Sequence, residues 1–365
     1  TYTGTTTING GTVQLNRSGG GTLPNNAEIN INNGGTLRVS SNQTLNSLTL
    51  NAGATLTVDA GVTLTIAGNF TYNGGTISST GSMAYTGGGV IIYNASRTAG
   101  IEWNAGNNPA AVTINTGTVT LNSTVTTSGS LTINSPGVLA AGSNTINIGG
   151  NWRNYASSGF TEATSTVIFN SSGSQSMNND GGTEDFFSLS KTGTGTLTLN
   201  TNAALAGTSS AFTLSNGIIN TGNFGLSGTV SSSFTISGGT LQLGRASTLP
   251  EFPTIANYSI TGGTIELTGA GNQVLRGGIA YNNLIFSGSS GNKTITSAIS
   301  SIASVTISGG NIVDVSNNTF GGATTDFTMT AGRFRTQGTG TKPDMANDYN
   351  LTGGVVEFYG NAGTI

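Results

Sequence analysis

The 365-residue chain contains 58 glycines, and only 7% of its residues are charged, against about 25% in an average soluble domain. Apolar residues make up 35% and recur in the alternating pattern of strands, which disordered chains lack. The net charge is -3, and the basic residues are scattered singly from Arg17 to Lys342, which argues against a nucleic-acid partner. These features predict an ordered, β-rich protein.

Cysteine is absent, so the chain has no disulfide framework and no thiolate chemistry. No apolar run reaches about 18 residues, and no charged-then-apolar leader begins at Thr1, so we expect neither membrane insertion nor a signal peptide in this sequence. We therefore expect a mature or excised portion of a longer extracellular protein.

A long internal period begins at residue 83. Four corresponding segments are Met83-Ala-Tyr-Thr-Gly, Val167-Ile-Phe-Asn-Ser-Ser-Gly, Ile265-Glu-Leu-Thr-Gly-Ala-Gly and Val356-Glu-Phe-Tyr-Gly. Alignment of Tyr85, Phe169, Leu267 and Phe358 gives steps of about 84, 98 and 91 residues. We predict superunits at about 1–82, 83–165, 166–263, 264–354 and 355–365, the last one incomplete, so we expect the array to continue beyond Ile365.

Two aromatic residues, Trp152 and Tyr155, lie in the loop-like stretch Asn151-Trp-Arg-Asn-Tyr. An exposed aromatic ring can stack on a pyranose, so both are candidate glycan contacts. Aromatic residues at strand positions more often fill the core, which is the competing interpretation.

One cluster of carboxylates stands out in this weakly charged chain. Asp180, Glu184 and Asp185 lie in the turn-rich stretch Asn178-Asn-Asp-Gly-Gly-Thr-Glu-Asp, which we predict to be a loop. Their oxygens are candidate Ca²⁺ ligands, although a solvated loop explains the same residues without a metal. Glycosidases also require two carboxyl groups, roughly 5–9.5 Å apart in a cleft.

The chain contains no His and no Cys, which are common catalytic bases, nucleophiles and ligands of transition metals. We therefore expect no catalytic residues, no enzymatic activity, and no cofactor apart from the candidate Ca²⁺.

A shorter repeat is clearest in the C-terminal half. Its copies are Phe212-Thr-Leu-Ser-Asn-Gly, Phe234-Thr-Ile-Ser-Gly-Gly, Tyr258-Ser-Ile-Thr-Gly-Gly, Val305-Thr-Ile-Ser-Gly-Gly, Phe327-Thr-Met-Thr-Ala-Gly and Tyr349-Asn-Leu-Thr-Gly-Gly. Successive copies start about 22, 24, 47, 22 and 22 residues apart, and the longest step contains a further copy, Leu284-Ile-Phe-Ser-Gly.

Each copy alternates apolar and polar residues, ends in a glycine turn, and is followed by a second alternating strand. One copy is too small to bury a core, so copies must stack, with Leu214, Ile236 and Ile260 in one inward column. The sequence predicts an all-β parallel β-helix, or β-solenoid, with coils of about 22 residues that continue through residues 1–365. Tandem immunoglobulin-like β-sandwiches are the alternative, because the period near 90 residues also suits them.

The charged residues have a positional explanation in this stacked arrangement. Counting eight residues from each copy predicts one outward polar column, formed by Asn220, Gln242, Glu266, Arg335 and Glu357. Arg335 and Glu357 would then be neighbours on successive coils, with their charged groups within reach of an ion pair.

Several strings resemble the repeat units of very large surface and secreted proteins of Bacteroidota. They are Gly150-Asn-Trp, Thr166-Val-Ile-Phe-Asn-Ser-Ser-Gly-Ser-Gln, Asp185-Phe-Phe-Ser-Leu and Gly195-Thr-Leu-Thr-Leu-Asn. The resemblance implies an adhesin or filament at the cell surface or outside the cell, often exported by the type 9 secretion system. It implies neighbouring repeats, surface glycans and the secretion machinery as partners.

We therefore expect a non-catalytic structural and adhesive stalk or filament segment. A polysaccharide-active β-helix enzyme or a carbohydrate-binding solenoid is the alternative. Ice binding is a third hypothesis, suggested by the triplets Thr55-Leu-Thr, Thr63-Leu-Thr, Thr118-Val-Thr and Thr196-Leu-Thr. A flat ice-matching face needs coils of one length, however, and the coil lengths in this sequence vary.

Overall fold

The computed structural model describes residues 4–16, 27–180, 182–248, 257–337 and 347–360. These residues form 43 strands, and no helix occurs among them. The chain divides into two units, which are described separately. Unit 1 contains Thr1–Phe169 and Asn178–Gly182, and unit 2 contains Asn170–Met177 and Thr183–Ile365.

The strands form a β-solenoid of about 16 turns, with equivalent strands about 21 residues apart. All the strand pairings that the structure describes are parallel, as a solenoid requires. The prediction of a parallel β-helix is confirmed. Immunoglobulin-like sandwiches are excluded, because they are built from antiparallel sheets.

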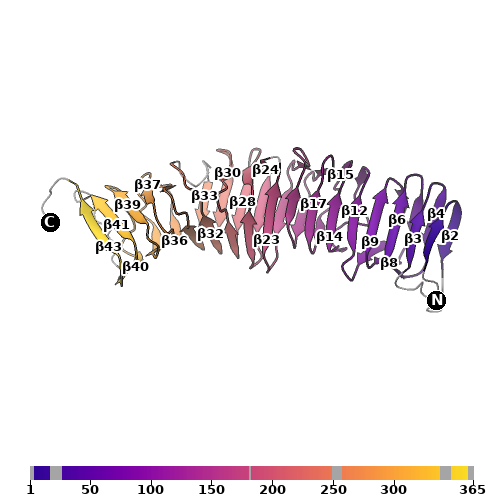
Figure 1. The fold of residues 1–365 in the computed structure, drawn as a ribbon, viewed down its shortest axis with the longest axis horizontal. Coiled ribbons are helices and arrows are strands. Elements are labelled where there is room, and N and C mark those ends of the chain that lie inside the picture. The colour runs from indigo at the N-terminus through magenta and orange to yellow at the C-terminus, as the bar shows by residue number, and fades with distance from the viewer. Residues whose placement is uncertain (1–3, 17–26, 181, 249–256, 338–346, 361–365) are drawn as a thin grey trace. The chain divides into compact units, whose positions relative to one another are not determined.

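In unit 1, most turns of the chain, or coils, contribute strands to three walls, which we name by their order in the coil (Figure 1). The first wall contains β1 (Thr5–Ile8), β3 (Glu28–Ile31), β6 (Ser47–Asn51), β9 (Asn69–Asn73), β12 (Val90–Tyr93), β14 (Ala111–Ile114), β17 (Ser130–Ile133) and β20 (Trp152–Asn154). The second wall contains β2 (Gly11–Leu15), β4 (Gly35–Val39), β7 (Thr55–Val58), β10 (Thr76–Ile77), β13 (Arg97–Thr98), β15 (Thr118–Thr120), β18 (Val138–Ala140) and β21 (Phe160–Thr161). The third wall contains β5 (Gln43–Leu45), β8 (Thr63–Ile66), β11 (Ser82–Tyr85), β16 (Val125–Thr127), β19 (Thr145–Ile148) and β22 (Thr166–Phe169).

In unit 2, the first wall contains residues 175–177 of β23 (Gln175–Asn179), then β26 (Thr196–Leu199), β29 (Ile218–Asn220), β32 (Thr240–Leu243), β34 (Thr264–Leu267), β36 (Tyr281–Phe286), β38 (Ile302–Ile307), β40 (Asp326–Met329) and β42 (Asp348–Leu351). The strands that follow the first-wall strand within each coil form two separate sheets. One sheet contains β24 (Thr183–Phe186), β27 (Asn202–Leu205) and β30 (Leu226–Ser227). The other contains β35 (Gln273–Leu275), β37 (Asn292–Ile295), β39 (Ile312–Ser316), β41 (Arg333–Gln337) and β43 (Val355–Tyr359). The strands that precede the first-wall strand are β25 (Ser188–Lys191), β28 (Ala211–Leu214), β31 (Ser233–Ile236) and β33 (Asn257–Ile260).

Alternation of apolar and polar residues forms the core. In β28, Phe212 and Leu214 are fully buried, whereas the intervening Thr213 is only half-buried, because successive side chains of a strand point to opposite faces. Stacking in register then makes the inward side chains continuous, and the predicted column Leu214, Ile236 and Ile260 is confirmed.

The short sequence repeat changes walls within unit 2. Its copies at Phe212, Phe234 and Tyr258 lie in β28, β31 and β33, whereas the copies at Val305, Phe327 and Tyr349 lie in first-wall strands. The change falls at Leu284, which pairs with Ile265 of the preceding first-wall strand and not with a strand of the wall that holds Tyr258. The 47-residue step between the copies at Tyr258 and Val305 therefore contains an extra copy, and at this copy the repeat moves from one wall to the next.

This shift divides the predicted outward polar column. Asn220, Gln242 and Glu266 are neighbours on the first wall, as predicted. Arg335 and Glu357 are neighbours on β41 and β43, which belong to a different sheet. The prediction of a single column is therefore wrong, because Ile285 of β36 stands beside Glu266.

The four residues aligned in the long repeat also occupy different walls. Tyr85 and Phe169 lie on third-wall strands of unit 1, Leu267 lies on the first wall of unit 2, and Phe358 lies on β43. The superunits remain a prediction from the sequence.

Candidate functional site

Within the described residues, the third wall of unit 1 is interrupted once. β11 and β16 lie two coils apart, and the coil between them, which contains β12 and β13, places the loop at residues 99–110 where a third-wall strand would lie. Among the described strands, β11 pairs only with β8, and β16 pairs only with β19. Two strand edges therefore face the loop, and their polar backbone groups need other partners.

Hydrogen bonds join the loop to both flanking strands. The indole Nε1 of Trp103 donates to the backbone oxygen of Thr126 at 3.1 Å, and Tyr85 Oη donates to the backbone oxygen of Glu102 at 2.9 Å. The backbone oxygen of Pro109 accepts from the backbone nitrogen of Ser128 at 2.9 Å. The loop is thus fixed to both flanking strands.

A buried ion pair holds the loop from inside. Glu102 is fully buried and accepts from Arg97 at two atoms, with Nε–Oε1 at 2.6 Å and Nη2–Oε2 at 3.1 Å. Tyr93 Oη and the backbone nitrogen of Gly100 also donate to Oε1, at 3.2 and 3.1 Å. Four donors therefore satisfy the carboxylate, the arrangement that a buried charge requires.

Aromatic rings surround this ion pair. The Arg97 guanidinium lies 5.2 Å from the centre of the Tyr72 ring, and the Tyr93 ring contacts both Tyr72 and Trp103. Burial, together with the Glu102 charge, raises the pKa of Tyr85 and Tyr93 well above the ordinary value. Both tyrosines therefore remain neutral hydrogen-bond donors at neutral pH.

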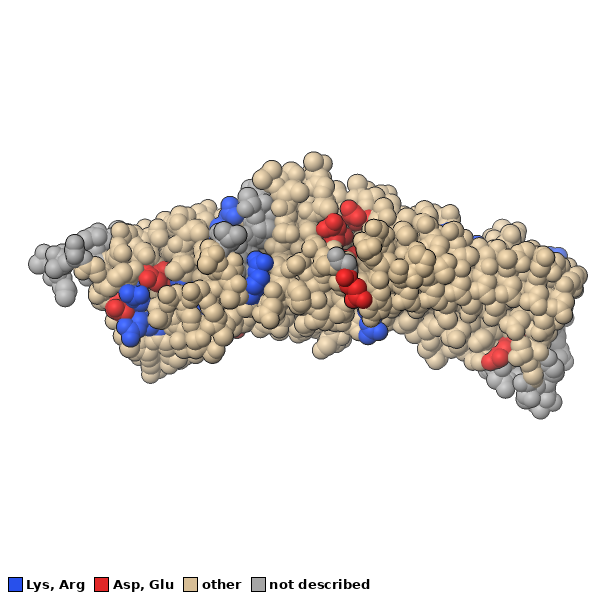
Figure 2. Space-filling view, turned by 45° about the horizontal axis from the view of Figure 1, so that its top comes forward, with Lys and Arg blue, Asp and Glu red and all other residues tan. Residues whose placement is uncertain are grey.

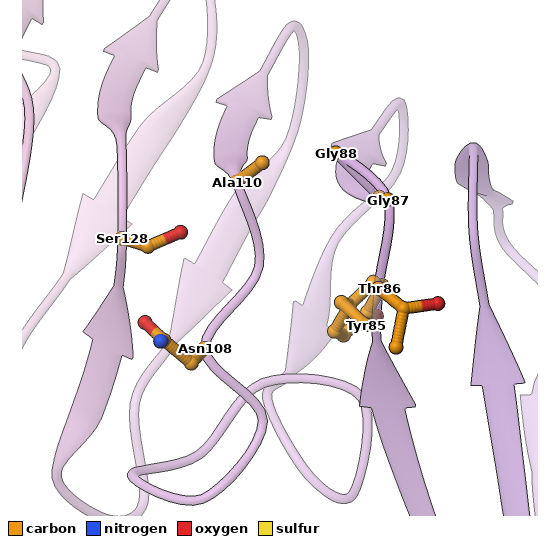
Figure 3. Close-up of a pocket in the computed structure, with 8 residues that line it drawn as sticks. Tyr85, Thr86, Gly87, Gly88, Asn108, Ala110 and Ser128 are labelled. Carbon is orange, nitrogen blue, oxygen red and sulfur yellow. The ribbon is translucent and has the colours of Figure 1, made fainter.

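A notch of about 250 Å³ opens where the third wall is interrupted (Figure 3). The turn Gly87–Gly89 forms one side of it, and Asn108, Ala110 and Ser128 form the other. The Asn108 amide and the Ser128 hydroxyl point into the gap between their two chain segments. Asn108 has a φ of 48°, in the left-handed region that few residues other than glycine adopt. Residues in such backbone conformations occur often at binding sites. The lining residues are uncharged.

An asparagine ladder follows the first wall of unit 1. Each side-chain amide donates to the amide oxygen one coil earlier at 2.7–2.8 Å, through Asn9, Asn32, Asn51, Asn73, Asn94, Asn115 and Asn134. Sequence reasoning missed this ladder. The sequence does contain a pattern that indicates the ladder: once per coil, an Asn stands at the end of a first-wall strand or directly after it.

The two predicted glycan contacts differ in exposure. Trp152 is fully buried, with its ring 4.8 Å edge-to-face from Phe160, so it has no surface to offer a sugar. The structure corrects that hypothesis for Trp152, because the residue lies on β20 and points inward. Tyr155 is 41% exposed. Its backbone nitrogen bonds to Ile133 as that of Asn134 bonds to Ile114, so Tyr155 takes the next position of the asparagine ladder.

The three predicted carboxylate ligands do not lie in one loop. Asp180 belongs to unit 1, whereas Glu184 and Asp185 lie on β24 in unit 2. Glu184 is buried and Asp185 is exposed, because adjacent residues of a strand point to opposite faces. Among the described residues, no three carboxylates gather in a way that could hold a metal ion.

The predicted ion pair between Arg335 and Glu357 is confirmed, with Arg335 Nε 3.1 Å from Glu357 Oε2. Arg333 also reaches Glu357 at 2.7 Å, and Tyr359 Oη donates to Asp314 at 2.7 Å. Figure 2 shows groups of positively and negatively charged side chains on a face that is otherwise mostly uncharged.

Buried side chains of unit 2 donate to carbonyl groups at a corner of the coil. Lys293 Nζ lies 2.6 Å from the backbone oxygens of both Gly269 and Gly271, one coil earlier. The amide of Asn311 donates to Phe286 and Gly288 in the same way, at 3.1 and 2.8 Å. This pattern explains an otherwise costly buried lysine without a ligand.

The threonine triplets do not lie side by side. Thr55 and Thr57 have Thr36 and Arg38 as neighbours on β4, and the second triplet, Thr63 and Thr65, has Ser82 and Ala84 on β11. The third triplet adjoins Val138 and Ala140, and the fourth adjoins Ile218 and Asn220. An ordered ice-binding face would need aligned triplets.

The fold and these side chains define a parallel β-solenoid with one notched wall. The chain matches none of the known family models, curated proteins or solved structures with which it was compared. Among the described residues, no helix is long and apolar enough to cross a membrane.

Proposed function

We propose that the chain is a non-catalytic structural and adhesive repeat segment of an extracellular surface protein, in which stacked coils present a lateral binding face. The observation that supports this proposal most strongly is the first wall, which continues without interruption through eight strands of unit 1. Each coil is hydrogen-bonded to the coils before and after it along this wall. Such nearest-neighbour stacking suits a stalk, because coils can be added without any change in the contacts of each coil.

The asparagine ladder supports the structural part of this proposal. It fixes the register of successive coils, because a shift of one residue would separate every amide from its partner. The same geometry recurs over many coils, as expected of a segment selected for regular stacking.

The notch favours a carbohydrate-binding role within the same proposal. Its uncharged polar lining suits a neutral, hydroxyl-rich ligand, and its volume is below the range of about 300–1,000 Å³ typical of drug-sized pockets. A single sugar ring therefore suits it better than an extended oligosaccharide. The ion pair between Arg97 and Glu102 joins the loop that carries Asn108 to β13.

One experiment separates adhesion from catalysis. Immobilised protein is incubated with a panel of neutral and acidic glycans, and both retained glycan and released oligosaccharide are measured. We expect retention of neutral glycans without release. Asn108→Ala should reduce retention, whereas Asn69→Ala, on the exposed surface of β9, should not. Release of oligosaccharide, or no retention across the panel, would contradict the adhesive function.

A further inference from the structure

The asparagine ladder of unit 1 ends in an open hydrogen-bond acceptor. All its amides point the same way, because each Nδ2 donates to the Oδ1 one coil earlier. The last of them, Asn134, donates to Asn115 at 2.7 Å, so Asn134 Oδ1 is directed toward the next coil. Within the described residues nothing donates to this oxygen, and Asn134 is only half-buried. Aligned hydrogen bonds polarise one another, which makes this oxygen a stronger acceptor than that of an isolated amide.

The two residues that follow Asn134 along the line of the ladder cannot extend it. Tyr155 takes the next position, with its backbone nitrogen 2.8 Å from the backbone oxygen of Ile133. Asp180 takes the position after that, with its backbone nitrogen 3.0 Å from the backbone oxygen of Asn154. Neither side chain carries an amide to continue the chain of hydrogen bonds. An aromatic residue therefore stands between an amide oxygen and a carboxylate on successive coils of unit 1.

The aromatic side chain and the carboxylate are open to solvent. Tyr155 is 41% exposed, and Asp180 is exposed as well. No described residue donates to the Asp180 carboxylate, which accepts hydrogen bonds and donates none when it is ionised. The surface thus offers an acceptor on either side of an exposed ring, and both acceptors lack a protein donor among the described residues.

We propose that Asn134, Tyr155 and Asp180 form a second saccharide site, at the end of the ladder, for a neutral pyranose with equatorial hydroxyl groups. The proposal extends the adhesive function, on which it rests, to a surface separate from the notch. In such a sugar the axial C–H groups make both ring faces apolar, and the hydroxyl groups point outward from the rim. One face stacks on the Tyr155 ring, whose face is the negative part of its quadrupole.

The spacing of the coils suits one sugar ring. The Cα atoms of Asn134 and Asp180 are two strand spacings apart, about 10 Å, with Tyr155 halfway between them. Hydroxyl groups at opposite edges of a stacked pyranose then donate to Asn134 Oδ1 on one side and to the Asp180 carboxylate on the other. Both acceptors gain the donor that the protein does not supply.

Saturation-transfer NMR with methyl β-D-glucopyranoside tests the site. The Asn108→Ala chain is used throughout, so that the notch does not contribute. This chain should still bind the glycoside, with the strongest saturation on the C–H protons of one sugar face.

Variants made in the Asn108→Ala chain test each contact. Tyr155→Ala should abolish binding, whereas Tyr155→Phe should bind like the parent chain, because the ring remains. Asp180→Ala should weaken binding about tenfold or more, the loss expected for a hydrogen bond to a charged acceptor. Asn69→Ala, an exposed residue of β9, is the control and should change nothing. No binding by the parent chain, or a dissociation constant unchanged by Tyr155→Ala or by Asp180→Ala, would overturn the proposal.

The two proposals can fail separately. If the wild-type chain retains glycans but the Asn108→Ala chain binds no glycoside, the site at the ladder end is refuted and adhesion through the notch stands. If Tyr155→Ala abolishes binding while Asn108→Ala has no effect on retention, the site at the ladder end stands and the notch fails. If no chain binds, the adhesive function fails together with both sites.

Discussion

Removal of one asparagine from the middle of the ladder should weaken unit 1 measurably. Asn73 donates to Asn51 Oδ1 at 2.8 Å and accepts from Asn94 Nδ2 at 2.8 Å. Asn73→Ala removes both hydrogen bonds and leaves two partly buried amides with one partner fewer each. With a net contribution of about 0.5–1.5 kcal/mol per bond, the free energy of unfolding should fall by about 1–3 kcal/mol.

Asn69→Ala is the matched control, because Asn69 is an exposed residue at the other end of the same strand, β9. Asn73→Asp should give an intermediate result at neutral pH. The carboxylate can still accept from Asn94, but it has no proton to donate to Asn51. Its stability should recover when the carboxyl group is protonated at low pH.

Urea denaturation gives the change in stability, and hydrogen exchange of β6, β9 and β12 shows where it acts. Faster exchange should be confined to these strands and their neighbours, because coils interact with their nearest neighbours. If Asn73→Ala unfolds at the same urea concentration as Asn69→Ala, the ladder makes no net contribution and the reasoning fails.

Three other results are expected. Glu102→Gln should cost about 3 kcal/mol by thermal or urea denaturation, because it leaves the Arg97 guanidinium without its charged partner in a mostly buried position, and an unchanged midpoint would contradict this. Gly288→Ala should cost about 1–3 kcal/mol, because its Cβ would lie 2.2 Å from the backbone oxygen of Gly269, whereas Gly10→Ala has open space and should be nearly neutral in the same assay. Burial raises the pKa of Tyr93 and Tyr281, so their contribution to stability is complete below the unfolded-state pKa of about 10 and is lost as pH rises through the folded-state pKa. Denaturation midpoints that do not fall above about pH 10 would refute this assignment.

Features that depend on strand period and coil length were predictable from the sequence. The column Leu214, Ile236 and Ile260 follows from alternation with period two, combined with the spacing between successive copies of the repeat. The ion pair between Arg335 and Glu357 follows from the same spacing, because both residues lie at one position of successive copies. Local pattern alone determines these neighbours.

The walls could not be assigned in this way, because one string of residues suits any wall. The copy at Leu284 has the same alternation as that at Tyr258, yet it lies on the first wall. The length of the intervening turns decides the wall, and the repeat pattern does not contain that length. The burial of Trp152 could not be predicted, because its stretch of sequence resembles a loop, whereas Trp152 lies on β20 and points inward. The burial of Glu184 could have been predicted from the sequence. Phe186, two residues later on the same strand, is apolar and marks the inward face of that strand.

The interruption of the third wall could not be predicted from the sequence, for a different reason. Its sequence, residues 99–110, has no period, and its order depends on contacts with strands on either side. The partners of Glu102 include Tyr93 and Arg97 from the same coil, and Trp103 reaches Thr126 in the next. Only the assembled coils reveal that a buried carboxylate and an indole replace a strand.

Single-molecule force spectroscopy, with the chain held at its two ends, tests most directly whether the stacked coils form a structural stalk. Stacked coils should unfold in repeated small extensions, each a multiple of one coil of about 21 residues, or about 70 Å of released chain. Extension without resistance, or release of the whole chain in one step, would contradict it.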